Sequence, residues 1–441
     1  MYRLFSWEHS YFSGKVRAYL RYKTYHGALG EGFEDVLATR EILERILEPA
    51  TGTPAVPQLL APDGTWVQDS SEIIDFCEAR HPAPPVIPRP ATHPLQCLAS
   101  YLVELLADEW MVVYGFWERW HYSLEGIEPN HERFNAQQWG PLLAPDGSGS
   151  ERRAMGRFLF EQVMGIKDPD SAQIGVYAGI RDLGVNARTQ AAWEASHVRL
   201  MEQLEAHFDE HDFLLGGRPS LGDFGLLAPL YAHLYRDAVP GFTMRTRYPF
   251  VTEWVERTNG TNALNARSYN QKLYGVDDAG ELVARPANSH GGEWLSGDAL
   301  PDTLHPIVSI FFEEMWPVLV SSMEMLAKHM AGDTCEKGTE LPGKTFSVTP
   351  GFETLQREGG PLTHEFQIGD VRDRRMVLPY QVWMLQRLAE ALEACCATAA
   401  GDARVSELLG QFERGPELLE LPKRLEGCRV RKVQSRIFAD C

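Results

Sequence analysis

The stretch from Thr51 to Phe76 reads TGTPAVPQLLAPDGTWVQDSSEIIDF and decides the fold of the first part of the chain. An apolar run, a Pro-Asp-Gly turn and a second extended run over residues 58–68 predict a β-hairpin. Asp69-Ser70-Ser71 then predicts a helix start, because acidic and hydroxyl side chains cap free backbone N–H groups. Pro57 directly precedes the first strand, where the peptide bond before it can be cis. The stretch therefore predicts a proline loop, a hairpin and a helix in succession.

The residues before this stretch predict a strand, a helix, a second strand and a second helix. These elements are expected at residues 2–7, 15–23, 34–37 and 41–47, with a loop at residues 8–14. Together with the hairpin and the helix at residues 72–79, they give the order βαβ-ββα.

This order resembles the thioredoxin-like domain of the glutathione transferases. In that family the bond before the proline is cis, and the backbone of the residue at Val56 pairs with the cysteinyl part of glutathione. The acidic-Ser pair of the family matches Asp69-Ser70 and holds the γ-glutamyl end. An Asp suits the α-ammonium, while a Ser hydroxyl and free N–H groups at a helix N-terminus suit the carboxylate. The alternative is a capped surface helix that follows an ordinary hairpin.

The resemblance also implies a catalytic side chain in the loop after the first strand. Ser10 falls in that place, and Ser10-Tyr11-Phe12 is similar to the Ser-Pro-Phe of the Ser-type classes. A hydroxyl there would donate a hydrogen bond to the glutathione sulfur and favour the thiolate. Ser13 and Tyr11 are rivals for this role, and Tyr11 replaces the usual proline. Lys15 is interpreted either as a solvated surface charge or as a cation that steers the glycine carboxylate of glutathione.

A Pro-rich connector, HPAPPVIPRPATHP, follows at residues 81–94, and helical patterns dominate after it. The resemblance implies an all-helical second domain here. On its long first helix, Trp110, Tyr114 and Trp117 are candidates for the substrate pocket, although a buried aromatic cluster explains them equally well. Ser220 and Asp223 form a Ser-x-x-Asp capping box, which resembles the folding motif of that domain and has a structural role.

The predicted fold class is α+β followed by all-α. We expect a thioredoxin-like domain at residues 1–82, a linker at 83–94 and a helical substrate domain at 95–260. Residues 261–441 form a mostly helical extension of unknown role.

Composition restricts the partners. The formal net charge of -19 argues against nucleic acid and against anionic membranes. No leader and no apolar run long enough to span a membrane are recognised, which predicts a cytoplasmic protein. The seven cysteines have no metal-like spacing. His207 and His211 have helical spacing but no third ligand nearby, so no metal is expected.

The leading hypothesis is a glutathione-dependent transferase. Glutathione would be the co-substrate, and the second substrate an electrophilic, partly apolar small molecule, as in detoxification. The family is usually dimeric, so a homodimer is expected. A non-catalytic binding or scaffold protein with the same fold is the alternative, and a cysteine-dependent thiol reductase is a third hypothesis.

Overall fold

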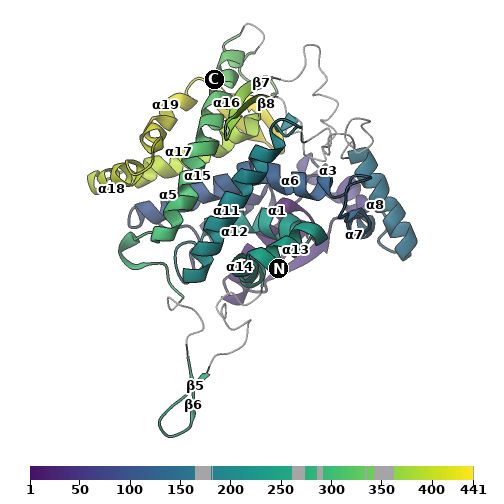
Figure 1. Cartoon of the computed structure of the whole chain (residues 1–441), viewed down its shortest axis with the longest axis horizontal. Helices are drawn as coiled ribbons and strands as arrows, with labels where there is room; N and C mark the ends of the chain where they lie inside the picture. Colours follow the sequence, from purple (N-terminus) through teal and green to yellow (C-terminus); the bar gives the residue numbers. More distant parts are fainter. Residues whose placement is uncertain are drawn as a thin grey trace.

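The computed structural model describes residues 1–163, 180, 182–260, 274–285, 292–332, 335–341 and 362–440. The helical part and the extension fill most of the body, and the N-terminal sheet, in purple, lies behind the helices in this view (Figure 1). The parts of the predicted extension between these ranges lie outside the described residues.

A four-stranded sheet with the spatial order β2-β1-β3-β4 forms the N-terminal part. Its strands are β1 (Tyr2–Ser6), β2 (Phe33–Leu37), β3 (Gln58–Leu60) and β4 (Trp66–Gln68). Its helices are α1 (Tyr11–Tyr25), α2 (Arg40–Ile42), α3 (Glu48–Thr51) and α4 (Ser70–Arg80), with a π-helical segment Leu43–Leu47 between α2 and α3. Strands β1 and β2 are parallel, and β3 is antiparallel to both β1 and β4. This confirms the predicted order and fold class.

Helix α1 begins at Tyr11, four residues before the predicted start. The reason is local, because the Ser10 side chain accepts a hydrogen bond from the Ser13 N–H and so caps the helix. The loop after β1 is correspondingly shorter than predicted.

The strand register brings three connections to one edge of the sheet. Phe5 lies opposite Gln58, and Gln58 lies opposite Gln68. The loop after β1, the residue before β3 and the residue after β4 therefore leave the sheet at the same end. These are the segments that hold Ser10, Pro57 and Asp69.

The helical part begins with one long rod. Helix α5 (Pro94–Leu106), a π-helical segment (Ala107–Met111) and α6 (Val112–His121) follow one another without a break. The other helices are α7 (Glu132–Trp139), α8 (Gly149–Val163), α11 (Gln190–Glu210), α12 (Leu221–Pro229), α13 (Ala238–Arg247) and α14 (Pro249–Asn259). A further π-helical segment, Leu230–Tyr235, continues α12.

The predicted capping box is present at the start of α12. Asp223 accepts hydrogen bonds from the Ser220 N–H and hydroxyl, both at 2.8 Å. The same carboxylate accepts from the Leu214 N–H at 3.0 Å and from the Trp254 indole at 3.2 Å. Asp223 therefore joins a turn, α12 and α14 in the core, as a structural residue should.

In its described residues, the extension contains helices and three separate hairpins. Its helices are α15 (His305–Ile310), α16 (Trp316–Met330), α17 (Pro379–Cys395), α18 (Ala399–Leu409) and α19 (Leu421–Leu425). Its strands pair as β5 (Tyr274–Val276) with β6 (Leu282–Ala284), β7 (Thr363–Ile368) with β8 (Val371–Met376), and β9 (Val430–Val433) with β10 (Arg436–Ala439). The β5–β6 hairpin projects far from the body (Figure 1).

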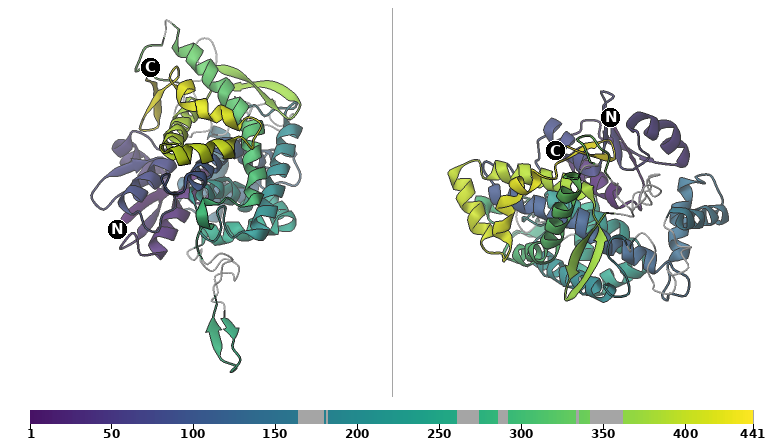
Figure 2. Two further views of the ribbon diagram at one scale, coloured as in Figure 1. Left: turned by 90° about the vertical axis from the view of Figure 1, so that its left-hand side faces the viewer. Right: turned by 90° about the horizontal axis from the view of Figure 1, so that it is seen from above.

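The rest of the extension is not an independent body. Trp316 and Leu385 of the extension belong to the same buried cluster as Leu102 of α5 and Leu4 of β1. Figure 2 shows the last strands of the chain beside the N-terminal domain. Among the described residues, no helix has the length and apolar character needed to cross a membrane.

Candidate functional site

The first component of the site is the Ser10 end of the sheet edge, where α1 begins. Ser10 is half-buried. Its oxygen accepts the Ser13 N–H at 3.3 Å, which leaves the hydroxyl proton for donation to a ligand. The N-terminus of a 15-residue helix also favours negative charge at this position.

The two rival hydroxyls are placed differently. Ser13 is fully buried, and its oxygen faces back to β1 and accepts the Trp7 N–H at 3.4 Å. The Tyr11 hydroxyl donates to the Ala107 carbonyl at 2.6 Å inside the helical part. Burial, with Asp108 and Glu109 close by, raises the pKa of Tyr11 well above its usual value. Of the three, Ser10 has the most accessible hydroxyl.

The second component is the proline loop before β3. The Val56–Pro57 bond is cis, as the resemblance implies, and Val56 is half-buried. The buried Gln58 side chain braces this loop, because its amide donates to the carbonyls of Thr53 at 2.8 Å and Ala55 at 3.0 Å. A side chain from the first residue of β3 thus fixes the loop against the sheet edge.

The third component is the Asp69 end, where α4 begins. The Asp69 carboxylate accepts the Ser71 N–H at 2.9 Å and caps the helix. Asp69 has a φ of 94°, which turns the chain sharply from β4 into α4. Asp69 is 7% exposed and Ser70 is 4% exposed. The predicted γ-glutamyl site is therefore not an open surface in this structure.

Two side chains of the extension account for this burial. The Tyr380 hydroxyl, from the first turn of α17, donates a hydrogen bond to the Asp69 carboxylate. The Lys432 ammonium, on β9, lies 3.9 Å from the same carboxylate and 3.1 Å from that of Glu72. Lys432 also lies over the Trp383 ring, with its nitrogen 4.9 Å from the ring centroid. The carboxylate that should hold the glutathione ammonium therefore already has partners from residues more than 300 positions away.

The β9–β10 hairpin reaches the proline loop as well. Its turn residue Gln434 packs against Gly52, where an added Cβ would lie only 2.0 Å from the Gln434 side-chain oxygen. Gln386 of α17 fixes the other end of the hairpin, because its amide donates to the Val430 carbonyl at 3.0 Å and accepts the Val430 N–H at 2.8 Å. Helix α17 and the hairpin therefore act as one cover over the sheet edge.

A buried ion cluster lies beneath this cover. The Lys15 ammonium lies 2.7 Å from Glu104 and 2.6 Å from Asp108, and none of the three side chains is more than 3% exposed. Arg387 of α17 contacts Glu104 at 3.0 Å and Asp75 at 2.9 Å. Burial would raise the pKa of Glu104, but Arg387 and Lys15 outweigh it and hold that pKa at about 2. Both interpretations of Lys15 were wrong, because its ammonium is buried and pairs with two carboxylates of the core.

The three candidates for the substrate pocket are buried in the helical part. Trp110 packs on Trp193 with ring centroids 4.6 Å apart, and Tyr114 stacks on His197 at 3.4 Å. Trp117 stacks on His121 at 4.7 Å. These contacts agree with the alternative of a buried aromatic cluster, and their contact with a substrate stays a prediction.

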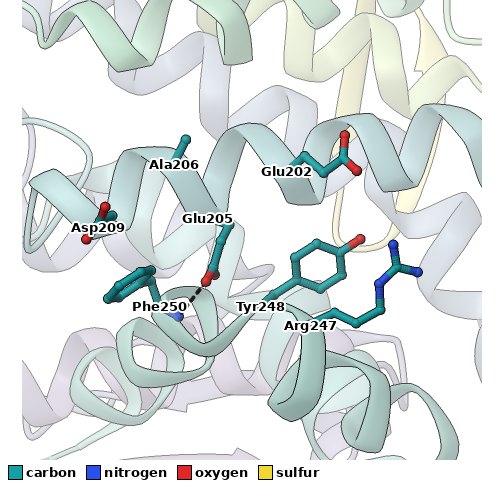
Figure 3. A pocket seen from close by; sticks show the side chains of 7 residues that line it. All are labelled: Glu202, Glu205, Ala206, Asp209, Arg247, Tyr248 and Phe250. Carbon is teal, nitrogen blue, oxygen red and sulfur yellow. Dashed lines mark hydrogen bonds between the residues drawn. The ribbon is translucent and has the colours of Figure 1, made fainter.

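Two shallow depressions lie on the helical part. One, of about 320 Å³, lies between α11 and the start of α14, where Glu205 accepts the Phe250 N–H (Figure 3). The other, of about 410 Å³, lies beside His131 and Arg133. Neither brings together a nucleophile and a base. Within the described ranges, no group of three or more His, Cys, Asp or Glu side chains is arranged to hold a metal ion.

Comparison with protein families assigns both parts of this architecture. Residues 4–85 match the family model for the glutathione S-transferase N-terminal domain, and residues 188–257 match that for the C-terminal domain. These two parts of the chain therefore belong to the glutathione S-transferase family. Both matches end before residue 260, so the extension that covers the sheet edge lies outside them.

Comparison with solved structures gives distant likenesses. A glutathione S-transferase from Rhodospirillum rubrum is 17% identical and matches 66% of this chain and 99% of its own, with a TM-score of 0.34. One from Methylobacterium radiotolerans, in complex with glutathione sulfonate, is 21% identical over 62% and 97%, with a TM-score of 0.33. The β-etherase LigF from Sphingobium is 19% identical over 59% and 95%, with a TM-score of 0.35. No curated protein sequence matches the chain.

Sequence analysis missed the covering residues Tyr380, Lys432 and Gln434. The β-branched residues at both ends of Val430-Arg431-Lys432-Val433 could have predicted a strand. No local signal could have shown that this strand lies over α4.

Proposed function

We propose that the protein binds glutathione at the sheet edge and activates its thiol for attack on an electrophilic, partly apolar small molecule. The observation that carries this proposal is the strand register, which brings Ser10, Pro57 and Asp69 to one end of the sheet. One edge of the sheet then carries all three groups that glutathione needs. They are a thiol activator at Ser10, a backbone partner for the cysteinyl unit beside Pro57, and a γ-glutamyl partner at Asp69.

In this proposal each component binds one part of glutathione. The Asp69 carboxylate would hold the α-ammonium, and the Ser70 hydroxyl with the first N–H groups of α4 would hold the carboxylate. The Val56 backbone beside Pro57 would pair with the cysteinyl unit, which places the sulfur near Ser10. No metal takes part.

Ser10 would act on the thiol. Its hydroxyl donates to the sulfur, and the N-terminus of α1 adds a partial positive charge. Both stabilise the thiolate over the thiol, whose pKa in free cysteine is about 8.5. The protein then raises the concentration of the nucleophile at neutral pH and orients it for attack on the electrophile.

The proposal extends to a cytoplasmic homodimer with a role in detoxification. The net charge of -19 supports a small-molecule enzyme rather than a nucleic-acid-binding protein.

A non-catalytic binding protein is the second candidate, and one observation favours it. The Asp69 carboxylate already has Tyr380 and Lys432 as partners. If the protein is non-catalytic, no panel of electrophiles will show glutathione-dependent turnover above the uncatalysed rate. One substrate with clear turnover disposes of this candidate.

The deciding experiment is the pH–rate profile of glutathione conjugation for the wild type and Ser10→Ala. Loss of the hydroxyl removes a donor to the thiolate, so the apparent pKa of the bound thiol should rise by about one unit or more. The variant should be slower than the wild type at pH 6.5 and approach it above pH 9. Ser13→Ala is the matched control and should keep the wild-type profile. Superimposable profiles for the wild type and Ser10→Ala would exclude Ser10 as the activator.

A further inference from the structure

The Lys432 ammonium has the same chemistry as the α-ammonium of glutathione. It lies between two carboxylates at the start of α4, 3.1 Å from Glu72 and 3.9 Å from Asp69. The Lys432 side chain is only 3% exposed. A primary ammonium from the protein thus occupies the place where the proposed function needs one from the ligand.

The surroundings leave little space for both groups. Asp69 and Ser70 are buried, and Tyr380 donates a hydrogen bond to the same carboxylate oxygen that Lys432 approaches. Gln434 fills the space next to Gly52 at the end of the proline loop. The Lys432 ammonium, the Tyr380 hydroxyl and the Gln434 side chain all come from α17 and the β9–β10 hairpin.

We propose that the C-terminal hairpin is an intramolecular competitor of glutathione, in which Lys432 occupies the α-ammonium position until the hairpin moves away. This inference rests on the proposed function, because it takes the Asp69 end as the γ-glutamyl site. It adds that the hairpin covers the Asp69 end in the absence of ligand. Glutathione and the hairpin cannot occupy that end at the same time.

The hairpin is built in a way that permits such movement. Each of its strands has four residues, and among the described residues β10 also pairs with the short segment 338–341, through the bridge between Glu340 and Phe438 and three backbone hydrogen bonds. Several of its contacts are exposed ion pairs, such as Arg436 with Glu340 and Lys337 with Asp440. Short terminal elements of this kind open at lower free energy than the core.

The first test is calorimetric titration of glutathione into the wild type, Lys432→Met and the matched control Arg436→Met. Met keeps the aliphatic stem of Lys432 and removes the ammonium that competes for Asp69. Because a closed state lowers apparent affinity by the fraction of open protein, Lys432→Met should bind roughly tenfold more tightly. Arg436 lies on the same hairpin and is 56% exposed, so Arg436→Met should bind like the wild type.

A second variant and a second measurement support the first. Gln434→Ala removes the contact with Gly52 and should strengthen binding in the same direction by a smaller factor, even if Lys432→Met folds poorly. Hydrogen exchange of residues 430–439 in the wild type should become faster when glutathione is added. Calorimetry thus reports competition, and exchange reports release of the hairpin.

The outcomes separate the two proposals. If glutathione binds the wild type and Lys432→Met equally, and hairpin exchange does not change, glutathione and the hairpin coexist and the competitor is excluded. In that case the proposed function stands. If glutathione binds neither protein nor Gln434→Ala at millimolar concentration, the half-site assignment itself is wrong, and the competitor fails with it.

Discussion

Two helices begin at the same edge of the N-terminal sheet, and their starts differ sharply. At the Ser10 end, a half-buried hydroxyl caps its own helix, and within the described ranges it makes no hydrogen bond to the extension. At the Asp69 end, a buried carboxylate caps its helix and also contacts Tyr380 and Lys432 of the extension. The extension covers the Asp69 end, which would recognise the ligand. It does not cover the Ser10 end, which would activate the ligand.

Charge explains this difference. A buried carboxylate is costly unless donors or cations surround it, so Asp69 needs partners when no ligand supplies them. A neutral hydroxyl that already accepts a hydrogen bond needs none. An extension that evolved on this scaffold could therefore gain stability at the Asp69 end and little at the Ser10 end.

The largest expected loss of stability comes from removing Arg387, which binds α17 to the buried carboxylates beneath it. Arg387→Met removes the cation that contacts both Glu104 and Asp75, and Glu104 is 1% exposed. Without Arg387, Lys15 has to balance the charges of both Glu104 and Asp108, so the free energy of unfolding should fall by about 3 kcal/mol or more. Urea unfolding followed by tryptophan fluorescence measures this loss.

The matched control for that prediction is Arg45→Met. Arg45 pairs with Glu41 on the surface, where both side chains are more than 70% exposed. This change should alter stability by less than about 0.5 kcal/mol. Equal effects of the two variants would contradict the view that α17 is held by a buried ion pair.

A middle-sized effect is expected at the Asp69 end itself. Tyr380→Phe removes one hydrogen bond to a buried carboxylate and leaves the ring in place. Hydrogen bonds to charged groups contribute about 1.5–3 kcal/mol, so stability should fall by that amount in thermal or urea unfolding.

Tyr235→Phe is the control, because the Tyr235 hydroxyl donates to Glu256 at an exposed position, at 2.7 Å. Its effect should be below about 1 kcal/mol. If Tyr380→Phe is no more costly than Tyr235→Phe, the Asp69 end is less tightly covered than the contacts indicate.

The smallest effect is expected at the Ser10 end. Ser10→Ala removes one helix cap and no hydrogen bond to the extension. The free energy of unfolding should therefore fall by about 1 kcal/mol. The measurement is urea unfolding alongside Tyr380→Phe. A loss larger than that of Tyr380→Phe would reverse the comparison between the two ends.

The N-terminal fold could be predicted because its signals are local. The Pro-Asp-Gly turn, the Asp-Ser helix start and the Ser-x-x-Asp box each specify the backbone within a few residues. The Asp223 cap followed from such signals, whereas the cis bond before Pro57 was implied by the family resemblance. The predicted start of α1 is four residues too late, because Ser10 was interpreted as a catalytic residue and not also as a helix cap.

The cover could not be predicted because its contacts join distant residues. Lys15 has the pattern of a surface lysine, and only the carboxylates of Glu104 and Asp108 explain its burial. Likewise, Lys432 meets Asp69 across more than 360 positions of sequence. A single sequence specifies that these residues are charged, but not which of them are neighbours.

The ion cluster around Glu104 also has a consequence for the order of events during synthesis. Translation supplies Lys15 and the carboxylates first, Arg387 almost 300 residues later and Lys432 after that. At about 5–20 residues per second, roughly 10–30 seconds separate the emergence of residue 260 from that of residue 432. During that interval the nascent chain can present an uncovered Asp69 end, and glutathione can reach it before the hairpin exists. The small molecule could then act as a folding ligand before the chain supplies its own ammonium.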